Sequence, residues 1–310
     1  MQLPYLDAHT VTGTLSWREV INALADAVGS QPSSASPVAR VAVPVAAGEL
    51  LLMPSETERA VGVKVVGVAP GNPDLRLPRV QGVFILMDAR TLTPVALMDG
   101  TALTNIRTPA LSALAVRELA PVDSRRLVVF GSGPQARAHI AAVCSVRPIE
   151  SVRIVARASR NVAVLIGELD GTEVDARAGI PADVADADIV VCATTARTAG
   201  FDGSLLGEHA CLVAVGSHEP DARELDDAVF RRASCVVVED RETALREAGD
   251  VIQAIAAGAV DLESLRDLRS VVVCRPSTDG ISVFKSVGMA WQDLAVAEAI
   301  WSTISQSAGD

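Results

Sequence analysis

The stretch "VVFGSGPQARAHI", residues 128–140, places a glycine-rich turn directly after an apolar run and before a segment that can form a helix. Gly131 allows a tight bend, Gly133 lets the backbone approach a pyrophosphate, and Ala136 is small enough for the helix to pack on the strand. The free N–H groups at the start of such a helix bind anions. The pattern alone is weak evidence, because ordinary strand-to-helix connections also carry it. With its context, it predicts a dinucleotide-binding turn made of Gly131, Ser132, Gly133, Pro134, Gln135 and Ala136.

The context is an alternation of strand-like and helix-like segments that begins near residue 125. Apolar runs predict strands at 127–130, 152–156, 188–193, 211–216, 235–238 and 271–274, and the stretches between them hold helices, as at 135–146 and 241–248. Alternating elements of this kind predict an α/β fold with a doubly wound parallel sheet of the Rossmann type. Ligands of such sheets bind at the carboxyl ends of the strands. We therefore expect the ribose and nicotinamide near Thr194, Thr195, Val215 and Gly216.

The end of the second strand in this series discriminates between NAD and NADP. An acidic residue there binds the ribose 2′-hydroxyl, whereas a basic residue accommodates a 2′-phosphate. The sequence "VRIVARASRN" supplies Arg157, Ser159 and Arg160 and no Asp or Glu. These residues favour NADP(H) over NAD(H), which stays possible, and the alternative is that the arginines are ordinary surface residues.

The first part of the chain has a different organisation. A helix is expected at 14–28 and a Pro/Ser-rich connection at 30–40, and short apolar segments with Gly and Pro between them predict strands and hairpins up to residue 99. A helix is then expected to begin with Thr108 as N-cap and Pro109 at its first position. The last helix, about 287–304, is expected to return to the first domain. The predicted domains are residues 1–115 with 286–310, which form a mixed α+β domain, and residues 116–285, which form the dinucleotide-binding domain.

Composition excludes several other classes of protein. The 310-residue chain has a formal net charge of -11 and no basic block, which argues against nucleic acid as a partner. No apolar stretch is long enough to cross a membrane, and no leader pattern is present at the N-terminus. The five cysteines are widely spaced and match neither a metal motif nor a disulfide framework. These features predict a cytoplasmic protein without a metal site.

Eight segments together resemble the ornithine cyclodeaminase/mu-crystallin family. They are "LLMPS" (51–55), "GVKVV" (62–66), "LTNIRTPALSALA" (103–115), "GSGPQA" (131–136), "DADIVVCATT" (186–195), "VGSHEPDARELD" (215–226), "REAGDV" (246–251) and "VFKSVGMAWQDLA" (283–295). The resemblance covers about nine-tenths of the chain in the expected order. It implies a homodimer, a substrate-binding and dimerisation domain completed by the C-terminal helix, and hydride exchange at the α-carbon of a small amino or imino acid.

The residues of the first domain fit this chemistry. Lys64 lies between valines in an apolar strand, where a solvated charge is unexpected, although a strand-edge lysine reaching water is the alternative. Arg107 is expected just before a helix start, which favours carboxylate binding over a surface ion pair. By resemblance, Arg40, Lys64 and Arg107 match the residues that bind the substrate carboxylate, and Lys64 matches the group at the imine nitrogen. Met53 is a further candidate for the substrate pocket.

Two departures from the family pattern bear on the reaction. Leu51 stands where ornithine cyclodeaminases tend to have a glutamate for the distal amine, and the loop "GSHEPDARELD" resembles the mu-crystallin version. His218 in that loop is a candidate acid or base because its ordinary pKa lies near neutrality. A histidine without a role is equally compatible with the sequence, and Asp221 and Glu224 lie nearby. Arg76 replaces a glycine that is usual before Leu-Pro in the family.

These observations predict an NADP(H)-dependent reductase of small cyclic or linear 2-imino acids. Two alternatives stay open. One is a cyclodeaminase that forms a cyclic amino acid from a diamino acid with bound NAD, and the other is a crystallin-like protein that binds the nucleotide without turnover. The presence of both Lys64 and Arg107 argues against the second alternative.

Overall fold

A computed structural model describes residues 3–30, 39–277 and 279–307. The chain divides into two compact units, of which one comprises Met1–Thr108 with Met289–Asp310 and the other comprises Pro109–Gly288. Most of the Pro/Ser-rich connection expected at 30–40 lies outside the described residues. No helix within the described ranges has the length and hydropathy that crossing a membrane requires.

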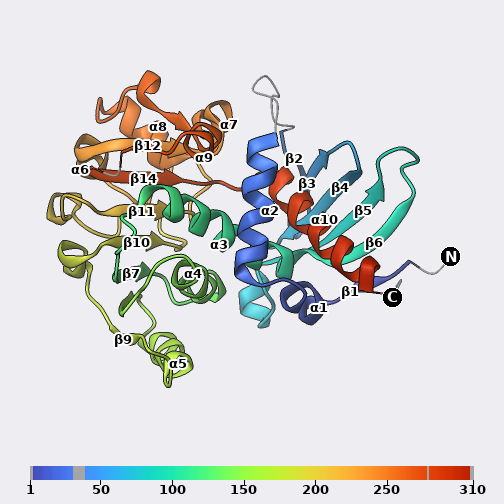
Figure 1. Cartoon of the computed structure of the whole chain (residues 1–310), viewed down its shortest axis with the longest axis horizontal. Helices are drawn as coiled ribbons and strands as arrows, with labels where there is room; N and C mark the ends of the chain where they lie inside the picture. Colours follow the sequence, from blue (N-terminus) through green and yellow to red (C-terminus); the bar gives the residue numbers. More distant parts are fainter. Residues whose placement is uncertain (1–2, 31–38, 278, 308–310) are drawn as a thin grey trace. The chain divides into compact units, whose positions relative to one another are not determined.

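The first unit contains a six-stranded sheet and the helices that cover one of its faces (Figure 1). The strand order is β1-β6-β5-β4-β3-β2, in which β2 to β6 form an antiparallel meander and β1 pairs in parallel with β6. The predicted strands and hairpins of this region are thereby confirmed. The elements are β1 (Tyr5–Leu6), α1 (Ala8–Gly13), α2 (Trp17–Ser30), β2 (Val41–Val45), β3 (Gly48–Glu56), β4 (Ala60–Val68), the 3-10 turn η1 (Asn72–Leu75), β5 (Val80–Asp88), β6 (Pro94–Asp99) and α10 (Ala290–Ser307).

Helix α2 begins where the sequence supplies a capping box. The Glu19 carboxylate accepts hydrogen bonds from the backbone N–H and the hydroxyl of Ser16, at 2.7 and 2.6 Å. Its apolar face buries Val20, Ile21, Leu24 and Val28. Helix α10 packs against α2 and against β3, β4 and β5. A β-carbon at Gly62 would lie 2.2 Å from the Phe84 ring and 3.0 Å from Leu294 Cδ1, so the missing side chain permits this close approach of helix and sheet.

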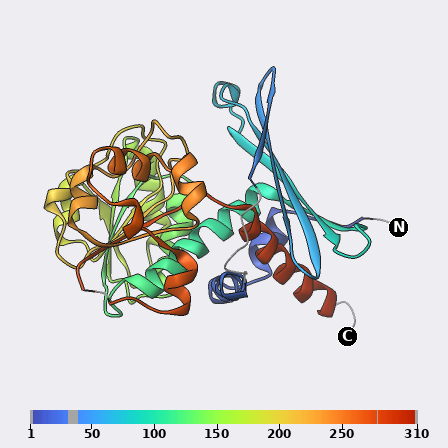
Figure 2. The same ribbon diagram turned by 90° about the horizontal axis from the view of Figure 1, so that it is seen from above.

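The second unit contains an eight-stranded parallel sheet of order β13-β12-β14-β11-β10-β7-β8-β9. Helices from the connections pack around it (Figure 2), and the predicted α/β fold class is confirmed. The elements are α3 (Gly100–Leu119), which begins in the first unit, and β7 (Arg126–Phe130), α4 (Pro134–Cys144), β8 (Ser151–Val155), α5 (Ser159–Leu169), β9 (Asp175–Ala178), η2 (Pro181–Asp186), β10 (Ile189–Cys192), η3 (Gly203–Leu205), β11 (Cys211–Ala214), α6 (Asp227–Arg232), β12 (Ala233–Val238), α7 (Arg241–Glu247), α8 (Gly249–Ala256), η4 (Leu262–Ser264), β13 (Arg266–Asp267), α9 (Leu268–Val273) and β14 (Ile281–Lys285).

Two expectations from the sequence are wrong. The run 271–274 is not a strand, because most of it belongs to helix α9, where Val271 is buried and Val273 is 68% exposed. The position beside β11 is occupied instead by β14, whose residues are all buried. The valine run showed β-branched composition but not the burial that a central strand requires.

The second wrong expectation is the start of helix α3. The helix begins at Gly100, where Asp99 Oδ1 accepts the N–H of Ala102 at 2.8 Å, and Pro109 lies inside it. Proline costs a helix one backbone hydrogen bond. The neighbouring Ala110 and Leu111 are fully buried, so packing offsets that loss and the helix continues.

Candidate functional site

In the first unit, Lys64 projects from the helix-covered face of the sheet. It lies opposite Met53 of β3 and Phe84 of β5, so these three side chains share one face. Lys64 is 2% exposed. Its ammonium donates hydrogen bonds to Asp293 Oδ1 at 2.8 Å, Asp293 Oδ2 at 2.7 Å and Thr104 Oγ1 at 3.1 Å. The strand-edge lysine reaching water is therefore not what the structure shows.

Arg107 lies inside helix α3 and not just before a helix start as predicted, and it approaches the same carboxylate from there. Its Nη1 donates to Gln292 Oε1 at 2.6 Å, and its Nε lies 3.4 Å from Asp293 Oδ1. Arg107 is 6% exposed, so its partners are buried groups and not surface acids. Arg40 is half-buried and close enough for its charge to lower the pKa of Lys64. The three predicted substrate-binding cations are thus neighbours, with Asp293 between two of them.

Burial lowers the pKa of Lys64 to about 8 from its ordinary value near 10.5. The negative charge of Asp293 opposes this effect, and the positive charges of Arg107 and Arg40 add to it. A lysine in such an environment is protonated at neutral pH and yet gives up its proton readily. This arrangement suits a proton donor that acts beside a carboxylate-binding arginine.

Asp293 and Gln292 were missed as site residues, although the sequence contained a signal for them. Both residues are fully buried in helix α10. They form an adjacent polar pair within a helix whose other buried residues are apolar, and a buried carboxylate needs a cationic partner. The spacing of Trp291 and Leu294 predicted the helix, but a single sequence does not reveal which cation faces Asp293.

In the second unit, the glycine-rich turn has the geometry that nucleotide binding requires. Gly131 has φ +121°, and a β-carbon there would lie 2.6 Å from the Ala193 carbonyl oxygen. Gly133 is the N-cap of α4 and offers no side chain to its N–H groups, with Pro134 following at the helix start. A β-carbon on Gly133 would have no neighbour within 4 Å among the described residues, which suits the approach of an anion to the N–H groups of this helix. Ser132 and Gln135 are partly buried in this turn, and Ala136 is buried against the strand.

A buried histidine forms hydrogen bonds with the glycine-rich turn and with helix α3. His139 Nδ1 donates to the carbonyl of Gln135 at 2.7 Å, and its Nε2 accepts from the Ser112 hydroxyl at 2.9 Å. Burial lowers the pKa of His139 to about 4, so the ring is neutral at physiological pH. This pair ties the first turn of α4 to α3, and no pattern in the sequence indicated it.

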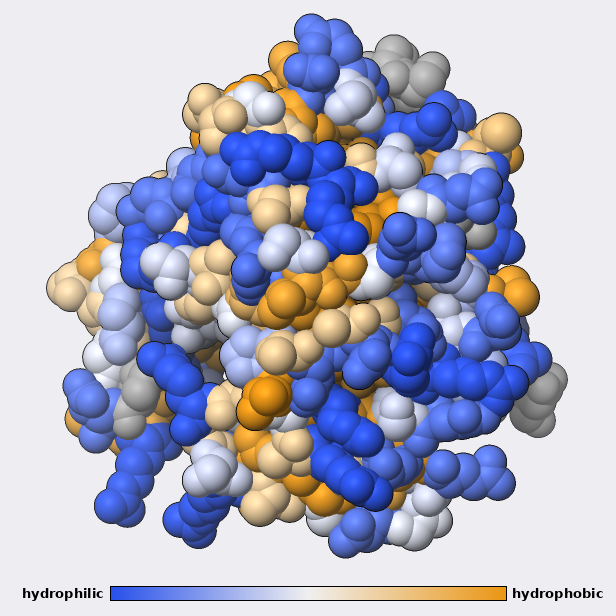
Figure 3. Space-filling model, turned by 90° about the vertical axis from the view of Figure 1, so that its left-hand side faces the viewer, coloured by the Kyte–Doolittle hydropathy of each residue, from blue (hydrophilic) through white to orange (hydrophobic). Residues whose placement is uncertain are grey.

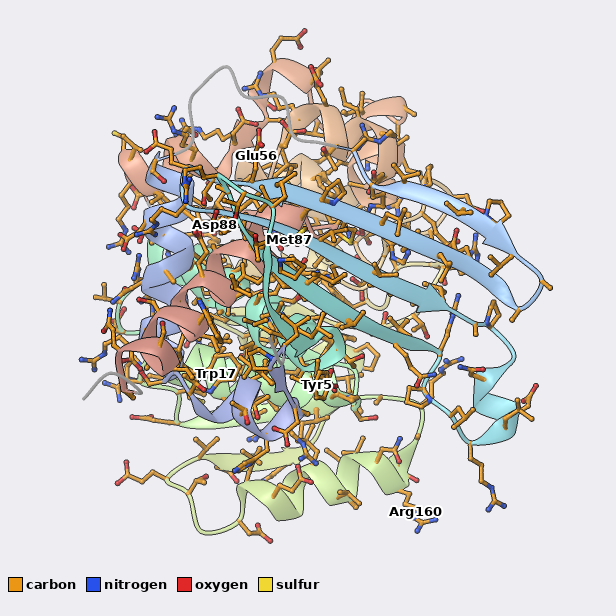
Figure 4. All side chains as sticks on the ribbon, turned by 90° about the vertical axis from the view of Figure 1, so that its right-hand side faces the viewer. Tyr5, Trp17, Glu56, Met87, Asp88 and Arg160 are labelled. Atoms are coloured by element: carbon orange, nitrogen blue, oxygen red, sulfur yellow. The ribbon has the colours of Figure 1, made fainter. Side chains whose placement is uncertain are left out.

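Arg157, Ser159 and Arg160 lie where β8 ends and α5 begins, and all three are exposed. Figure 4 shows Arg160 extending away from α5. Neither arginine forms an ion pair or hydrogen bond within the described ranges. The alternative of ordinary surface arginines therefore stays open on geometry alone.

The remaining predicted cofactor residues lie at the carboxyl ends of β10 and β11. Thr194 is partly buried and Thr195 is exposed, while Val215 and Gly216 are partly buried. Glu224 Oε1 accepts from the Thr194 N–H and hydroxyl at 2.8 and 2.7 Å, and its Oε2 accepts from the Gly216 N–H at 2.7 Å. The parallel register thus brings these positions together.

The loop that follows β11 distributes its polar residues differently. His218 is exposed, Asp221 forms an ion pair with Arg197, and Glu224 is only 2% exposed. Because both of its oxygens accept backbone hydrogen bonds, Glu224 is not a free base. Among the described residues, no group of three or more His, Cys, Asp or Glu side chains could hold a metal ion.

Together, the parallel sheet, the open glycine turn and the buried lysine–carboxylate–arginine cluster define a two-unit α/β protein of the dinucleotide-binding class. The family model described as the ornithine cyclodeaminase/mu-crystallin family matches residues 4–308. The chain therefore belongs to this family, as its sequence motifs predicted.

Individual relatives agree with the family assignment. The chain is 36% identical over 262 residues to a Δ1-pyrroline-2-carboxylate reductase of Bacillus cereus, covering 81% of this chain and 80% of that protein. It is 33% identical over 270 residues to the ketimine reductase mu-crystallin of Mus musculus, covering 86% and 84%. A solved structure of Thermococcus litoralis Δ1-pyrroline-2-carboxylate reductase in complex with NADH and L-proline superposes with a TM-score of 0.89 at 31% identity, covering 99% and 98%. The predicted class, a nicotinamide-dependent oxidoreductase, is confirmed.

Proposed function

We propose that the protein reduces a small cyclic 2-imino acid to the corresponding amino acid, with NADPH as the preferred reductant. The observation that carries this proposal is the buried Lys64 ammonium, which is held by Asp293 and adjoins Arg107. Relatives that are pyrroline-2-carboxylate reductases support the substrate class. The linear imino acids of the same size form the next group to test.

The side chains that share a face with Lys64 favour an imino acid over a diamino acid. Leu51 and Met53 are buried residues of β3 on that face, and Phe84 is buried on β5. An apolar side chain at position 51 offers no partner to a second amine. A buried ammonium group without a partner is costly, so this surface disfavours ornithine.

The proposed chemistry uses the side chains of the first unit as follows. Arg107, with Arg40, binds the substrate carboxylate and fixes the orientation of the α-carbon. Lys64 donates a proton to the imine nitrogen, which makes the C=N carbon more electrophilic. The Lys64 side chain, now a neutral amine, then regains a proton from water. Asp293 accepts two hydrogen bonds from the Lys64 ammonium and keeps it in place. The reduced nicotinamide, when bound, supplies the hydride that completes the amino acid.

The second unit fits that cofactor on its own geometry. The open N-terminus of α4 at Gly133 accepts a pyrophosphate, and Thr194, Thr195, Val215 and Gly216 lie at strand ends suited to the ribose and nicotinamide. The exposed Arg157 and Arg160 favour a 2′-phosphate and therefore NADP(H), with NAD(H) as the alternative. We assign no catalytic step to His218, whose exposed position also suits a group at the rim of the site.

One face of the first unit's sheet is not covered by any described helix, and this uncovered face supports a homodimer. Figure 2 shows α2 and α10 on one side of this sheet. On the other side, Val41, Val43 and Leu50 are 51%, 40% and 37% exposed. By register, this face continues through Leu52, Val63, Val65, Val83 and Ile85. Figure 3 shows a face made largely by the second unit, where apolar residues form small groups among hydrophilic ones. A contiguous apolar sheet face is typical of a subunit interface, so we propose a second copy as its partner.

We also propose a cytoplasmic location. All five cysteines are free thiols, which supports this location, namely Cys144, Cys192, Cys211, Cys235 and Cys274.

The two predicted domains are assigned different roles. We assign substrate binding and dimerisation to the domain predicted at 1–115 and 286–310, and cofactor binding to the domain predicted at 116–285.

The function is tested by absorbance at 340 nm with NADPH or NADH and either Δ1-pyrroline-2-carboxylate or Δ1-piperideine-2-carboxylate. Pyruvate with methylamine tests a linear imine, and ornithine with NAD, followed by direct detection of proline, tests the cyclodeaminase reaction. Oxidation of NADPH by a cyclic imine is the expected result. Proline formed from ornithine would overturn the proposal in favour of a cyclodeaminase, and binding of NADPH without turnover of any substrate would favour a crystallin-like protein.

A further inference from the structure

The second unit contains a buried cluster of three charged residues that the proposed reaction does not use. Glu224, Asp250 and Lys285 are 2%, 0% and 1% exposed. They gather at the carboxyl ends of β10, β11 and β14, which are neighbouring strands of the parallel sheet. We call these three residues the charged cluster.

Composition emphasises one member of this cluster. The chain has 27 lysines and arginines, of which only Lys64 and Lys285 are lysines. Both are buried, and each pairs with an aspartate at 2.7 and 2.8 Å, respectively. Lysine presents a compact ammonium where the larger planar guanidinium of arginine would not fit in the same way. The remaining 25 Lys and Arg positions are all arginine, so we expect that the site of Lys285 requires an ammonium group.

Lys285 and Asp250 fix the loop that follows β11. The Lys285 ammonium lies 2.8 Å from Asp250 Oδ2 and donates to the Ser217 carbonyl at 2.7 Å. Asp250 Oδ1 accepts the N–H groups of Glu224 and Leu225 at 2.7 and 2.9 Å. The two charges therefore hold both ends of the segment between residues 217 and 225.

Glu224 passes this constraint on to the strand ends. Its two oxygens accept the N–H groups of Thr194 and Gly216 together with the Thr194 hydroxyl. A β-carbon at Gly216 would lie 2.0 Å from the Thr194 carbonyl oxygen and 2.6 Å from Glu224 Oε1, so the packing leaves no room for adjustment. An acceptor with three donors around it matches an ionised carboxylate, although burial raises the pKa of Glu224.

This contact also removes hydrogen-bond donors from one part of the sheet edge. Free N–H groups at the ends of parallel strands attract anions. At Thr194 and Gly216 the Glu224 carboxylate already accepts from those groups, whereas Gly133, the N-cap of α4, provides no side-chain cap in the part of the chain that the structure describes. The N–H groups near Gly133 can therefore bind a phosphate, whereas those of Thr194 and Gly216 cannot.

We propose that the charged cluster is a positioning network for the cofactor: Glu224, held by Asp250 and Lys285, fixes Thr194 and Gly216 for the nicotinamide ribose and directs the pyrophosphate to the turn at Gly133. This inference rests on the proposed function, because it takes Thr194 and Gly216 as cofactor-binding positions. The three residues act through the backbone and need not contact the cofactor.

The test compares the binding of the whole cofactor with the binding of its adenine half. The variant is Glu224→Gln, whose amide group sets an N–H donor against a backbone N–H donor. Dissociation constants are measured without substrate, by protein fluorescence or calorimetry, for NADPH, for NADH, and for ADP or 2′-phospho-ADP, which lack the nicotinamide ribose. We expect NADPH and NADH to bind at least 10-fold more weakly and the adenine half to bind within 2-fold of the wild type.

Asp188→Asn is the matched control at the opposite edge of the sheet. Asp188 Oδ2 accepts the N–H groups of Arg125 and Arg126 at 2.8 and 2.9 Å, so it repeats the chemistry of Glu224 at the amino ends of the strands. We expect this variant to lower the melting temperature and to leave every dissociation constant within 2-fold. Should Glu224→Gln fail to fold, Glu224→Asp keeps the charge but shortens its reach, and the same split between the two halves is expected.

The outcomes separate the two proposals. Equal loss of binding for the whole cofactor and its adenine half would assign the charged cluster a general structural role and overturn the inference. Unchanged binding of both would also overturn it. Failure of the wild-type protein to bind NADPH or NADH would instead overturn the proposed function and, with it, the inference.

Discussion

The Lys64 ammonium lies 2.7 Å from Asp293 Oδ2, although the two residues are 229 positions apart in the sequence. Neither side chain is more than 2% exposed. An isolated buried charge is strongly disfavoured, so the pairing of Lys64 with Asp293 offsets the cost of burying both groups. The pair places an acidic ammonium beside Arg107 on the helix-covered face of the first unit's sheet.

Replacement of Lys64 tests its proposed role as proton donor. Lys64→Met keeps a side chain of similar length without the ammonium, and we expect kcat/KM for the cyclic imine to fall by roughly 10²–10⁴-fold, the usual contribution of a general acid. The dissociation constant for NADPH is expected to stay within 2-fold. Arg18→Met removes an exposed cation from the same unit and serves as control. Activity of Lys64→Met within 3-fold of the wild type would remove Lys64 from the mechanism.

The pKa of Lys64 predicts the pH profile. Because the protonated form is the donor, kcat/KM is expected to be constant well below pH 8 and to fall as the pH rises through about 8. The same pKa can be measured directly by NMR. Because the chain has two lysines, labelling lysine at Cε or Nζ gives two resonances. One resonance should titrate near pH 8 and should be absent from Lys64→Met.

Asp293→Asn tests the direction in which Asp293 shifts the pKa of Lys64. The charge of Asp293 raises the pKa of Lys64, so its removal should move both the kinetic limb and the NMR titration to lower pH. A limb that stays in place, or moves upward, would contradict the electrostatic role assigned to Asp293.

The sequence predicted the parallel sheet and its glycine-rich turn better than the polar contacts around Lys64. The elements around Gly131 and Gly133 follow one another along the chain, so local pattern and strand order sufficed. Asp293 and Gln292 come from a helix at the other end of the chain, and no local pattern reveals which strand they face. Proline at 109 and the valine run at 271–273 misled for a related reason, because burial by distant elements outweighed local preference.

The neutral, buried His139 predicts a pH dependence of stability. Its pKa in the folded state is about 4, below the value near 6.5 of an unfolded chain, so the unfolded state binds one more proton between these limits. The free energy of unfolding should therefore decrease as the pH falls from 6.5 to 4. Between pH 7 and 5, urea titrations should show the wild type losing about 2 kcal/mol more than His139→Gln. His9→Gln, at an exposed position, should retain the wild-type dependence, and equal behaviour of all three proteins would contradict the assignment.

The proposed dimer interface is tested by placing a charge on the uncovered sheet face. Val63 lies in the middle of β4, between Pro54 and Ile85 in register, so Val63→Glu would bury an unpaired carboxylate if a second copy covers this face. Light scattering at micromolar concentration should report a dimer for the wild type and a monomer for the variant. Val164→Glu, at a residue 54% exposed on α5, should remain dimeric. A monomeric wild type, or an unchanged Val63→Glu, would disprove this interface.

The proposed preference for NADPH is tested at the two exposed arginines that follow β8. If Arg157 and Arg160 bind a 2′-phosphate, the double substitution of both by Ala removes charge-assisted hydrogen bonds worth about 1.5–3 kcal/mol each when well formed, and less at an exposed site. We expect the dissociation constant for NADPH to rise by at least 10-fold and that for NADH to change by less than 2-fold. Arg177→Ala removes an arginine of the neighbouring strand that is paired with Asp175, and it should change neither value. Because NADH lacks the 2′-phosphate, it separates loss of a specific contact from loss of general positive charge. An equal effect on both cofactors would mean that these arginines are ordinary surface residues, and tighter binding of NADH than NADPH by the wild type would overturn the cofactor assignment.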